Sequence, residues 1–121
     1  MMRYTSIFNV NDGGERTIDP GRERLQPNQV ELVADYLSAC PMVMRCTATS
    51  PDILDPTAGS CVRSSVYTDG EWIWDESMLY YVQKYALSPK SAFISSLRDR
   101  NFRTMPVSED QRRAALAAFM A

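Results

Sequence analysis

The sequence contains no histidine, and this absence excludes several kinds of active site at once. Histidine is the commonest general base near neutral pH, so neither a Ser-His-Asp nor a Cys-His arrangement can be built from this chain. Glycine-rich phosphate-binding loops of the G-x-x-x-x-G-K or G-x-G-x-x-G type are also missing. Two carboxylates could still act as acid and base, but 121 residues without internal repeats offer little room for a sugar-binding cleft. The sequence therefore predicts a binding protein and not an enzyme.

Cysteine is scarce: the chain has three, Cys40, Cys46 and Cys61. Structural zinc sites take four Cys or His ligands, commonly in C-x-x-C pairs, and no such pair occurs here. We therefore expect no metal and no cofactor. An odd number of cysteines argues against a disulfide framework and favours a reducing compartment. We expect three reduced thiols that are buried, because free cysteine packs as a small apolar side chain.

Long apolar runs are missing as well. No stretch approaches the ~18 apolar residues of a membrane-spanning helix, and no apolar segment follows Met1-Met2-Arg3-Tyr4 as it would in a secretory signal. Hydrophobic residues make up 45% and charged residues 23% of the chain, which is typical of a globular protein. We expect one cytoplasmic domain spanning residues 1–121, with no membrane partner.

The five glycines and seven prolines divide the chain into short segments. Between Pro27 and Pro41, apolar side chains recur at helical spacing and predict a helix over residues 27–39. Strand-rich segments followed by helices predict an α+β fold, with a small, mostly antiparallel sheet of three or four strands, helices packed on it and a helical C-terminal third. The other expected elements are strands over 3–10 and 42–47, loops over 15–24 and 48–60, a helix capped by Asp75, a helix from Ser88-Pro89 to about Asn101, and a helix over 109–120 that starts with a Ser108/Gln111 capping box.

Residues 62–74 carry the clearest local pattern, in which Asp69-Gly70 joins two β-rich runs. This dipeptide favours a two-residue hairpin turn. The predicted register places Thr68 opposite Glu71, Tyr67 opposite Trp72, Val66 opposite Ile73 and Ser65 opposite Trp74. One face of the hairpin would then hold Val62, Val66 and Ile73, and the other Tyr67, Trp72 and Trp74, with Arg63 placed to stack on Trp74.

Charge is unevenly distributed along the chain. The net charge of -2 provides no global field for capturing nucleic acid, but residues 52–76 hold six acids against one arginine, and residues 77–121 hold three acids against seven bases. The acidic segment is either a solvated surface or a patch aimed at a basic partner. Likewise, the C-terminal arginines are either a solvated helical surface or a nucleic-acid site. The acids are Asp52, Asp55, Asp69, Glu71, Asp75 and Glu76, and the arginines are Arg98, Arg100, Arg103, Arg112 and Arg113.

Aromatic side chains concentrate in the same part of the chain. Two readings are open: a core in which a helix covers the hairpin's aromatic face, or a partly exposed platform, since Trp and Tyr are enriched at binding hot spots. We include Trp72 with the six acids as candidate partner-contacting residues. The cluster consists of Tyr67, Trp72, Trp74, Tyr80, Tyr81 and Tyr85.

Residues 66–93 resemble a segment of small bacterial immunity proteins, which are encoded beside polymorphic or contact-dependent toxins. The resemblance rests on the T-D-G-E-W-I-W hairpin over residues 68–74, on the following Tyr80-Tyr81 pair, and on Pro89 and Phe93. It covers roughly a quarter of the chain and carries no catalytic residue. It implies a protein of contact-dependent growth inhibition that binds a cognate toxin domain and occludes its active site or substrate surface. The alternative is a small nucleic-acid-associated or regulatory adaptor that uses the C-terminal arginines.

Overall fold

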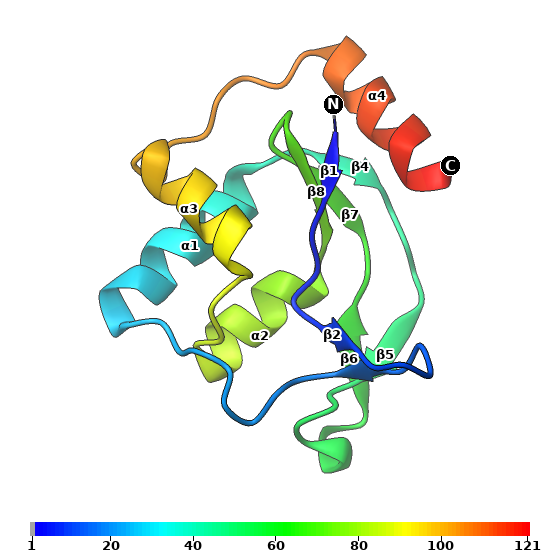
Figure 1. Cartoon of the computed structure of the whole chain (residues 1–121). Coiled ribbons are helices and arrows are strands. Elements are labelled where there is room, and N and C mark those ends of the chain that lie inside the picture. The colour runs from blue at the N-terminus through cyan, green and yellow to red at the C-terminus, as the bar shows by residue number, and fades with distance from the viewer. Residues whose placement is uncertain (1) are drawn as a thin grey trace.

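A four-stranded sheet with helices on both faces forms the centre of the molecule (Figure 1). The computed structural model describes residues 2–121. Strand order is β1-β8-β7-β4; β1 runs parallel to β8, and the other pairs are antiparallel. The predicted α+β fold is therefore confirmed. The strands are β1 (Arg3–Tyr4), β4 (Met42–Met44), β7 (Val66–Thr68) and β8 (Trp72–Asp75).

Two small hairpins flank this sheet. One consists of β2 (Asn9–Val10) and β3 (Arg16–Thr17), the other of β5 (Thr49–Pro51) and β6 (Ser60–Arg63). The single strand expected over residues 3–10 is thus wrong. Between β1 and β2 the chain leaves the sheet, and Ile7 and Phe8 insert into the core.

The four helices follow their local sequence signals closely. Helices α1 (Pro27–Ala39) and α4 (Glu109–Met120) have the predicted bounds, and the Ser108/Gln111 capping box is present. Helix α2 (Ser77–Tyr85) has Glu76 and not the predicted Asp75 as its N-cap, and α3 (Ser91–Asp99) is shorter than expected because it begins after Lys90. Asp75 ends β8, and its carboxylate accepts a hydrogen bond from the Ser77 amide at 3.0 Å, so it still serves the start of α2.

Helices α1, α2 and α3 cover the aromatic face of the sheet (Figure 1). The Phe93 ring centroid on α3 lies 5.3 Å from the centroids of both Trp72 and Trp74. These tryptophans and Tyr81 are at most 4% exposed, so the core interpretation of the aromatic cluster is correct for them. The remaining three members, Tyr67, Tyr80 and Tyr85, are partly buried around this core.

Helix α4 covers the opposite face of the sheet (Figure 1). Its contact is made by the small side chain of Ala115, which is fully buried against Val66 and Ile73. Of the larger apolar residues on this helix, Phe119 packs on the cluster and Leu116 is exposed.

The β7–β8 hairpin differs from its predicted register. Thr68 pairs with Ile73, and Tyr67 pairs with Trp74, so the turn is two residues longer than predicted. The Asp69 carboxylate causes the lengthening, because it accepts the amides of Glu71 at 2.9 Å and Trp72 at 2.7 Å. Side chains along a strand alternate between its two faces, so shifting the pairing by two residues leaves each side chain on its predicted face. Val66 and Ile73 therefore still share one face, and Tyr67, Trp72 and Trp74 the other. Val62 belongs to the separate strand β6 and packs in the main core, away from the Val66 cluster.

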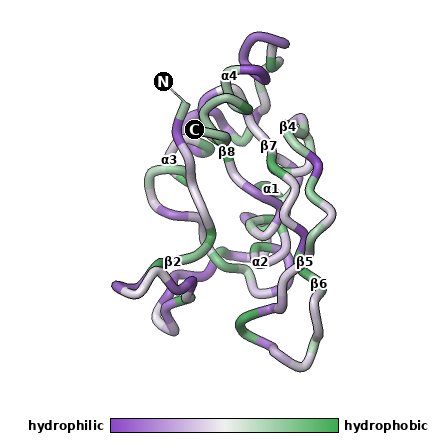
Figure 2. Tube along the Cα trace, turned by 90° about the vertical axis from the view of Figure 1, so that its right-hand side faces the viewer, coloured by the Kyte–Doolittle hydropathy of each residue, from purple (hydrophilic) through white to green (hydrophobic). Residues whose placement is uncertain are grey.

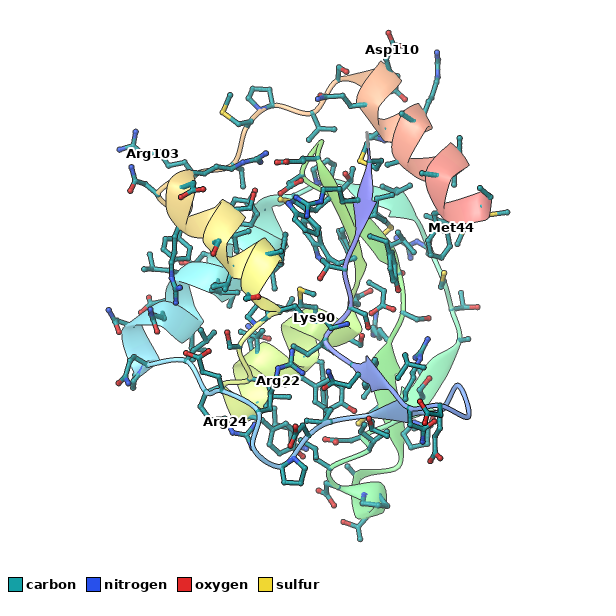
Figure 3. All side chains as sticks on the ribbon, in the orientation of Figure 1. Arg22, Arg24, Met44, Lys90, Arg103 and Asp110 are labelled. Atoms are coloured by element: carbon teal, nitrogen blue, oxygen red, sulfur yellow. The ribbon has the colours of Figure 1, made fainter. Side chains whose placement is uncertain are left out.

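The segment over residues 15–24, expected to be an exposed loop, is tied to the core by Arg22. Its guanidinium donates to the Ser88 carbonyl at 2.8 Å and to the Ile7 carbonyl at 2.8 Å. Figure 3 shows Arg22 directed toward the interior of the molecule. No helix within residues 2–121 is both long and apolar enough to span a membrane.

Candidate functional site

A fully buried carboxylate, that of Asp52, lies at the start of the loop that connects β5 to β6. Its Oδ2 accepts hydrogen bonds from the hydroxyls of Tyr80 at 2.8 Å and Tyr85 at 2.7 Å, and lies 3.4 Å from the ammonium of Lys84. Its Oδ1 accepts the backbone amide of Leu54 at 2.8 Å. All the side-chain donors come from α2, so the carboxylate fastens the loop to that helix.

We call residues 52–59 the Asp52 loop. It is held from several sides: the Ile53 amide donates to the Tyr81 hydroxyl at 3.0 Å, and the Asp55 carboxylate accepts the Thr57 amide at 3.2 Å. The loop contains the short 3-10 helix η1 (Pro56–Ala58) and projects from the lower end of the molecule (Figure 1). Ile53 and Leu54 are each 39% exposed. Figure 2 shows a hydrophobic stretch on the loop that projects below β5 and β6.

The hydrogen-bond donors around Asp52 stabilise its ionised form. Burial alone would raise the pKa of this carboxyl, but hydrogen bonds from Tyr85, Tyr80, the Leu54 amide and Lys84 lower it below its ordinary value. The same carboxylate raises the pKa of Tyr85, whose hydroxyl must keep its proton to donate it. The cluster is therefore a charged structural anchor at neutral pH.

A second buried carboxylate, that of Asp69, organises the opposite end of the molecule. It accepts the Tyr36 hydroxyl at 2.7 Å and lies 3.4 Å from the Arg100 guanidinium. Arg100 also donates to Glu71 at 2.7 Å and to the Tyr36 hydroxyl at 3.1 Å. Burial and the Asp69 carboxylate raise the pKa of Tyr36. This network joins α1, the β7–β8 turn and the end of α3.

Three of the seven predicted partner-contacting residues are buried, and the expectation that they lie on the surface is wrong. Asp52 is 0%, Asp69 3% and Trp72 4% exposed. Each carboxylate is used internally because backbone amides and hydroxyls satisfy it there. The Trp72 ring packs on Phe93 and is covered by the Arg3 guanidinium, 4.1 Å from the ring centroid. Arg3 thus takes the stacking role expected of Arg63, on a different tryptophan.

The other four predicted residues are partly exposed but lie on separate elements. Asp55 is in the Asp52 loop, Asp75 and Glu76 are at the start of α2, and Glu71 is in the β7–β8 turn, paired with Arg100. The turn and the loop lie at opposite ends of the molecule (Figure 1). The six acids consequently do not form one acidic surface.

The C-terminal arginines are also divided. Arg100 is engaged in the Asp69 network, while Arg113 lies 3.8 Å from Asp110 on α4. Arg103 points outward beyond α3, far from Asp110 at the start of α4 (Figure 3). A nucleic-acid site would need the arginines on one face, and the fold does not bring these five together.

The three cysteines are free, and they differ in burial. Cys40 is buried, and burial together with the Asp69 charge raises the pKa of its thiol to about 12. Cys46 is partly buried, whereas Cys61 is exposed, with its sulfur 3.4 Å from the Tyr80 hydroxyl. The expectation of three buried thiols is therefore correct only for Cys40. Residues 2–121 contain no cluster of three or more His, Cys, Asp or Glu side chains able to hold a metal ion.

Sequence reasoning missed the exposed residues Ile53 and Leu54 and the α2 side chains that position them. One signal was available: Tyr80 and Lys84 are four residues apart, and therefore lie on the same face of a helix. Which carboxylate they would meet could not be read from that spacing.

Comparison with protein-family models, curated proteins and solved structures finds no match to this chain.

Proposed function

We propose that the chain is an immunity-type protein that binds a bacterial toxin domain and occludes its active site or substrate surface, with the Asp52 loop as a principal contact. The supporting observation is the combination of a buried, multiply hydrogen-bonded carboxylate with exposed apolar neighbours on the same loop. An internal anchor of this kind serves a loop that must keep its shape.

Rigidity of the loop favours tight binding. Ordering a flexible loop on association costs free energy, and a loop already held in its bound conformation avoids much of that cost. Asp52 and Tyr81 both accept backbone amides of the loop, at 2.8 Å and 3.0 Å. Ile53 and Leu54 can therefore be presented to a partner with little loss of conformational freedom.

The chemistry of the loop indicates what it would contact. Ile53 and Leu54 would fill an apolar depression, and the neighbouring Asp55 would lie at its rim. Toxin domains that act on nucleic acids have basic clefts, and an acid beside an apolar contact complements such a cleft and steers association. Only Asp55, among the acids of this loop, is available for this role, since Asp52 is buried.

The experiment is co-purification with the C-terminal domain of the protein encoded by the gene directly upstream, followed by affinity measurement and an assay of that domain for toxicity. The double variant Ile53→Ala/Leu54→Ala should bind about 30-fold more weakly, because two truncated contacts amount to about 2 kcal/mol. Leu32→Ala/Leu116→Ala is the matched control, since those leucines are 43% and 39% exposed on other elements. The control should change affinity less than about threefold.

The immunity function and the role of the Asp52 loop as the contact are rejected by different results. If the upstream gene's product has no toxic domain, or if this chain neither binds that domain nor protects cells from it, the immunity function is rejected. If the complex forms and the loop double variant binds as tightly as the control, the Asp52 loop is rejected as the contact. Asp55→Asn keeps a side-chain oxygen that can accept the Thr57 amide, so it should mainly slow association and reduce its salt dependence.

A further inference from the structure

A polar hollow of about 330 Å³ lies where the connection from β4 to β5 faces β7 and the start of α2. Hydrogen bonds join the three segments that form its walls. The Ser65 hydroxyl accepts the Cys46 amide at 2.9 Å, and the Glu76 amide donates to the Ser65 carbonyl at 2.9 Å. The Ser64 hydroxyl donates to the Ala48 carbonyl at 3.1 Å. The walls are therefore part of the fold. The polar side chains that line the hollow include Arg45, Thr47, Arg63, Tyr67 and Glu76.

Two arginines give the hollow an excess of positive charge. Within residues 2–121, neither Arg45 nor Arg63 forms an ion pair. Burial and the Glu76 carboxylate raise the pKa of Tyr67, while Arg45 and Arg63 act in the opposite direction. Both guanidinium fields thus reach the same phenol. Two guanidinium groups, those of Arg45 and Arg63, and one carboxylate, that of Glu76, line a hollow that also contains hydroxyl groups.

We infer that this hollow binds a small phosphate monoester, with the phosphate between Arg45 and Arg63. Planar guanidinium groups match phosphate oxygens in geometry and remain charged at every physiological pH. The Tyr67 and Thr47 hydroxyls would donate to further oxygens. Glu76 would repel a bare phosphate, yet would accept a hydrogen bond from a hydroxyl or amino group on the ligand's organic part. A volume of about 330 Å³ leaves room for that part and is at the small end of ligand pockets.

The test is titration of the full chain with ribose 5-phosphate, O-phosphoserine, inorganic phosphate and ribose, monitored by calorimetry and by the NMR shifts of the arginine Nε–H groups. A phosphate ester should bind more tightly than inorganic phosphate, and ribose should not bind. The two esters separate a sugar phosphate from a phosphorylated side chain. Arg45→Gln and Arg63→Gln should each weaken binding by about tenfold or more. Arg103→Gln and Arg112→Gln, which remove exposed arginines elsewhere, are the matched controls.

Glu76→Gln distinguishes recognition of the ester from a general attraction of anions to the two arginines. Removing this carboxylate should strengthen binding of inorganic phosphate and reduce the preference for the ester. The inference is overturned if neither ester shifts the Arg45 and Arg63 signals, if the control arginines respond as strongly, or if Glu76→Gln leaves the ester preference unchanged. Thermal melts of all variants check that the fold is retained. None of these substitutions alters the Asp52 loop, so failure here is independent of toxin binding.

Discussion

The Tyr36 hydroxyl donates to the Asp69 carboxylate at 2.7 Å, although 33 residues separate the two in sequence. Tyr36 lies on α1 and Asp69 in the β7–β8 turn, so this contact joins the first helix to the central hairpin. The same carboxylate accepts the Trp72 amide at 2.7 Å and thereby sets the turn. A side chain that looked like part of an acidic surface is an internal organiser of the fold.

Asp69→Ala should lower the free energy of unfolding by about 3 kcal/mol, since it leaves buried donors without an acceptor and Arg100 without its buried partner. Urea denaturation measures the loss. Asp12→Ala, which changes an exposed acid in the β2–β3 turn, should alter stability by less than about 0.5 kcal/mol. Equal effects of the two substitutions would contradict the role assigned to Asp69.

Asp52 should make stability fall in acid. Because its folded-state pKa is below the ordinary value of about 3.9, its contribution is complete above about pH 4 and is lost as the pH falls through the lower folded pKa. Asp52→Asn should therefore be less stable at neutral pH by about 1–3 kcal/mol, and the difference should shrink below about pH 4. Denaturation across the acid range tests this. Asp35→Asn, on the exposed side of α1, is the control, and a pH-independent deficit in Asp52→Asn would be the contrary result.

Gly70 should resist substitution for two reasons. Its φ is +98°, a conformation that β-branched residues rarely adopt, and an added Cβ would lie 3.1 Å from Gln111 of the α4 capping box. Gly70→Val should cost about 1–3 kcal/mol in thermal or urea unfolding. Gly13→Val is the comparison: its backbone has no positive φ, and an added Cβ would meet its nearest neighbour at 3.4 Å. If both variants unfold at the same temperature or urea concentration as the parent protein, the backbone at Gly70 does not exclude a β-branched residue.

The three thiols should react at different rates with iodoacetamide. At about pH 8 the exposed Cys61 should be labelled first, the partly buried Cys46 more slowly, and Cys40 only on unfolding, because its pKa is raised to about 12. Peptide mass spectrometry identifies the labelled residue, and labelling in denaturant serves as the control. Intact mass and metal analysis of protein purified without reductant should find three reduced thiols and no bound metal. Rapid labelling of folded Cys40, or stoichiometric zinc, would be the opposing findings.

The helices with the predicted bounds are those whose signals are local. Pro27 and Pro41 delimit α1, and Ser108 with Gln111 begins α4. Capping and proline effects act within one helical turn, so they can be read from neighbouring residues. The assignment of the β7–β8 side chains to two faces was equally local, because alternation along a strand does not depend on what it packs against.

Tertiary structure alone decided which acids are exposed. Asp52 meets Tyr80 and Tyr85 across 28 and 33 residues, and Asp69 meets Arg100 through the packing of α3 beside the hairpin. A carboxylate is buried when distant donors compensate its desolvation, and local sequence does not contain that information. The sequence by itself therefore determined the α+β class, two helices and the division of the β7–β8 side chains between two faces. The fold determined that Ile53 and Leu54 are exposed on one loop and that Arg45 and Arg63 line one hollow.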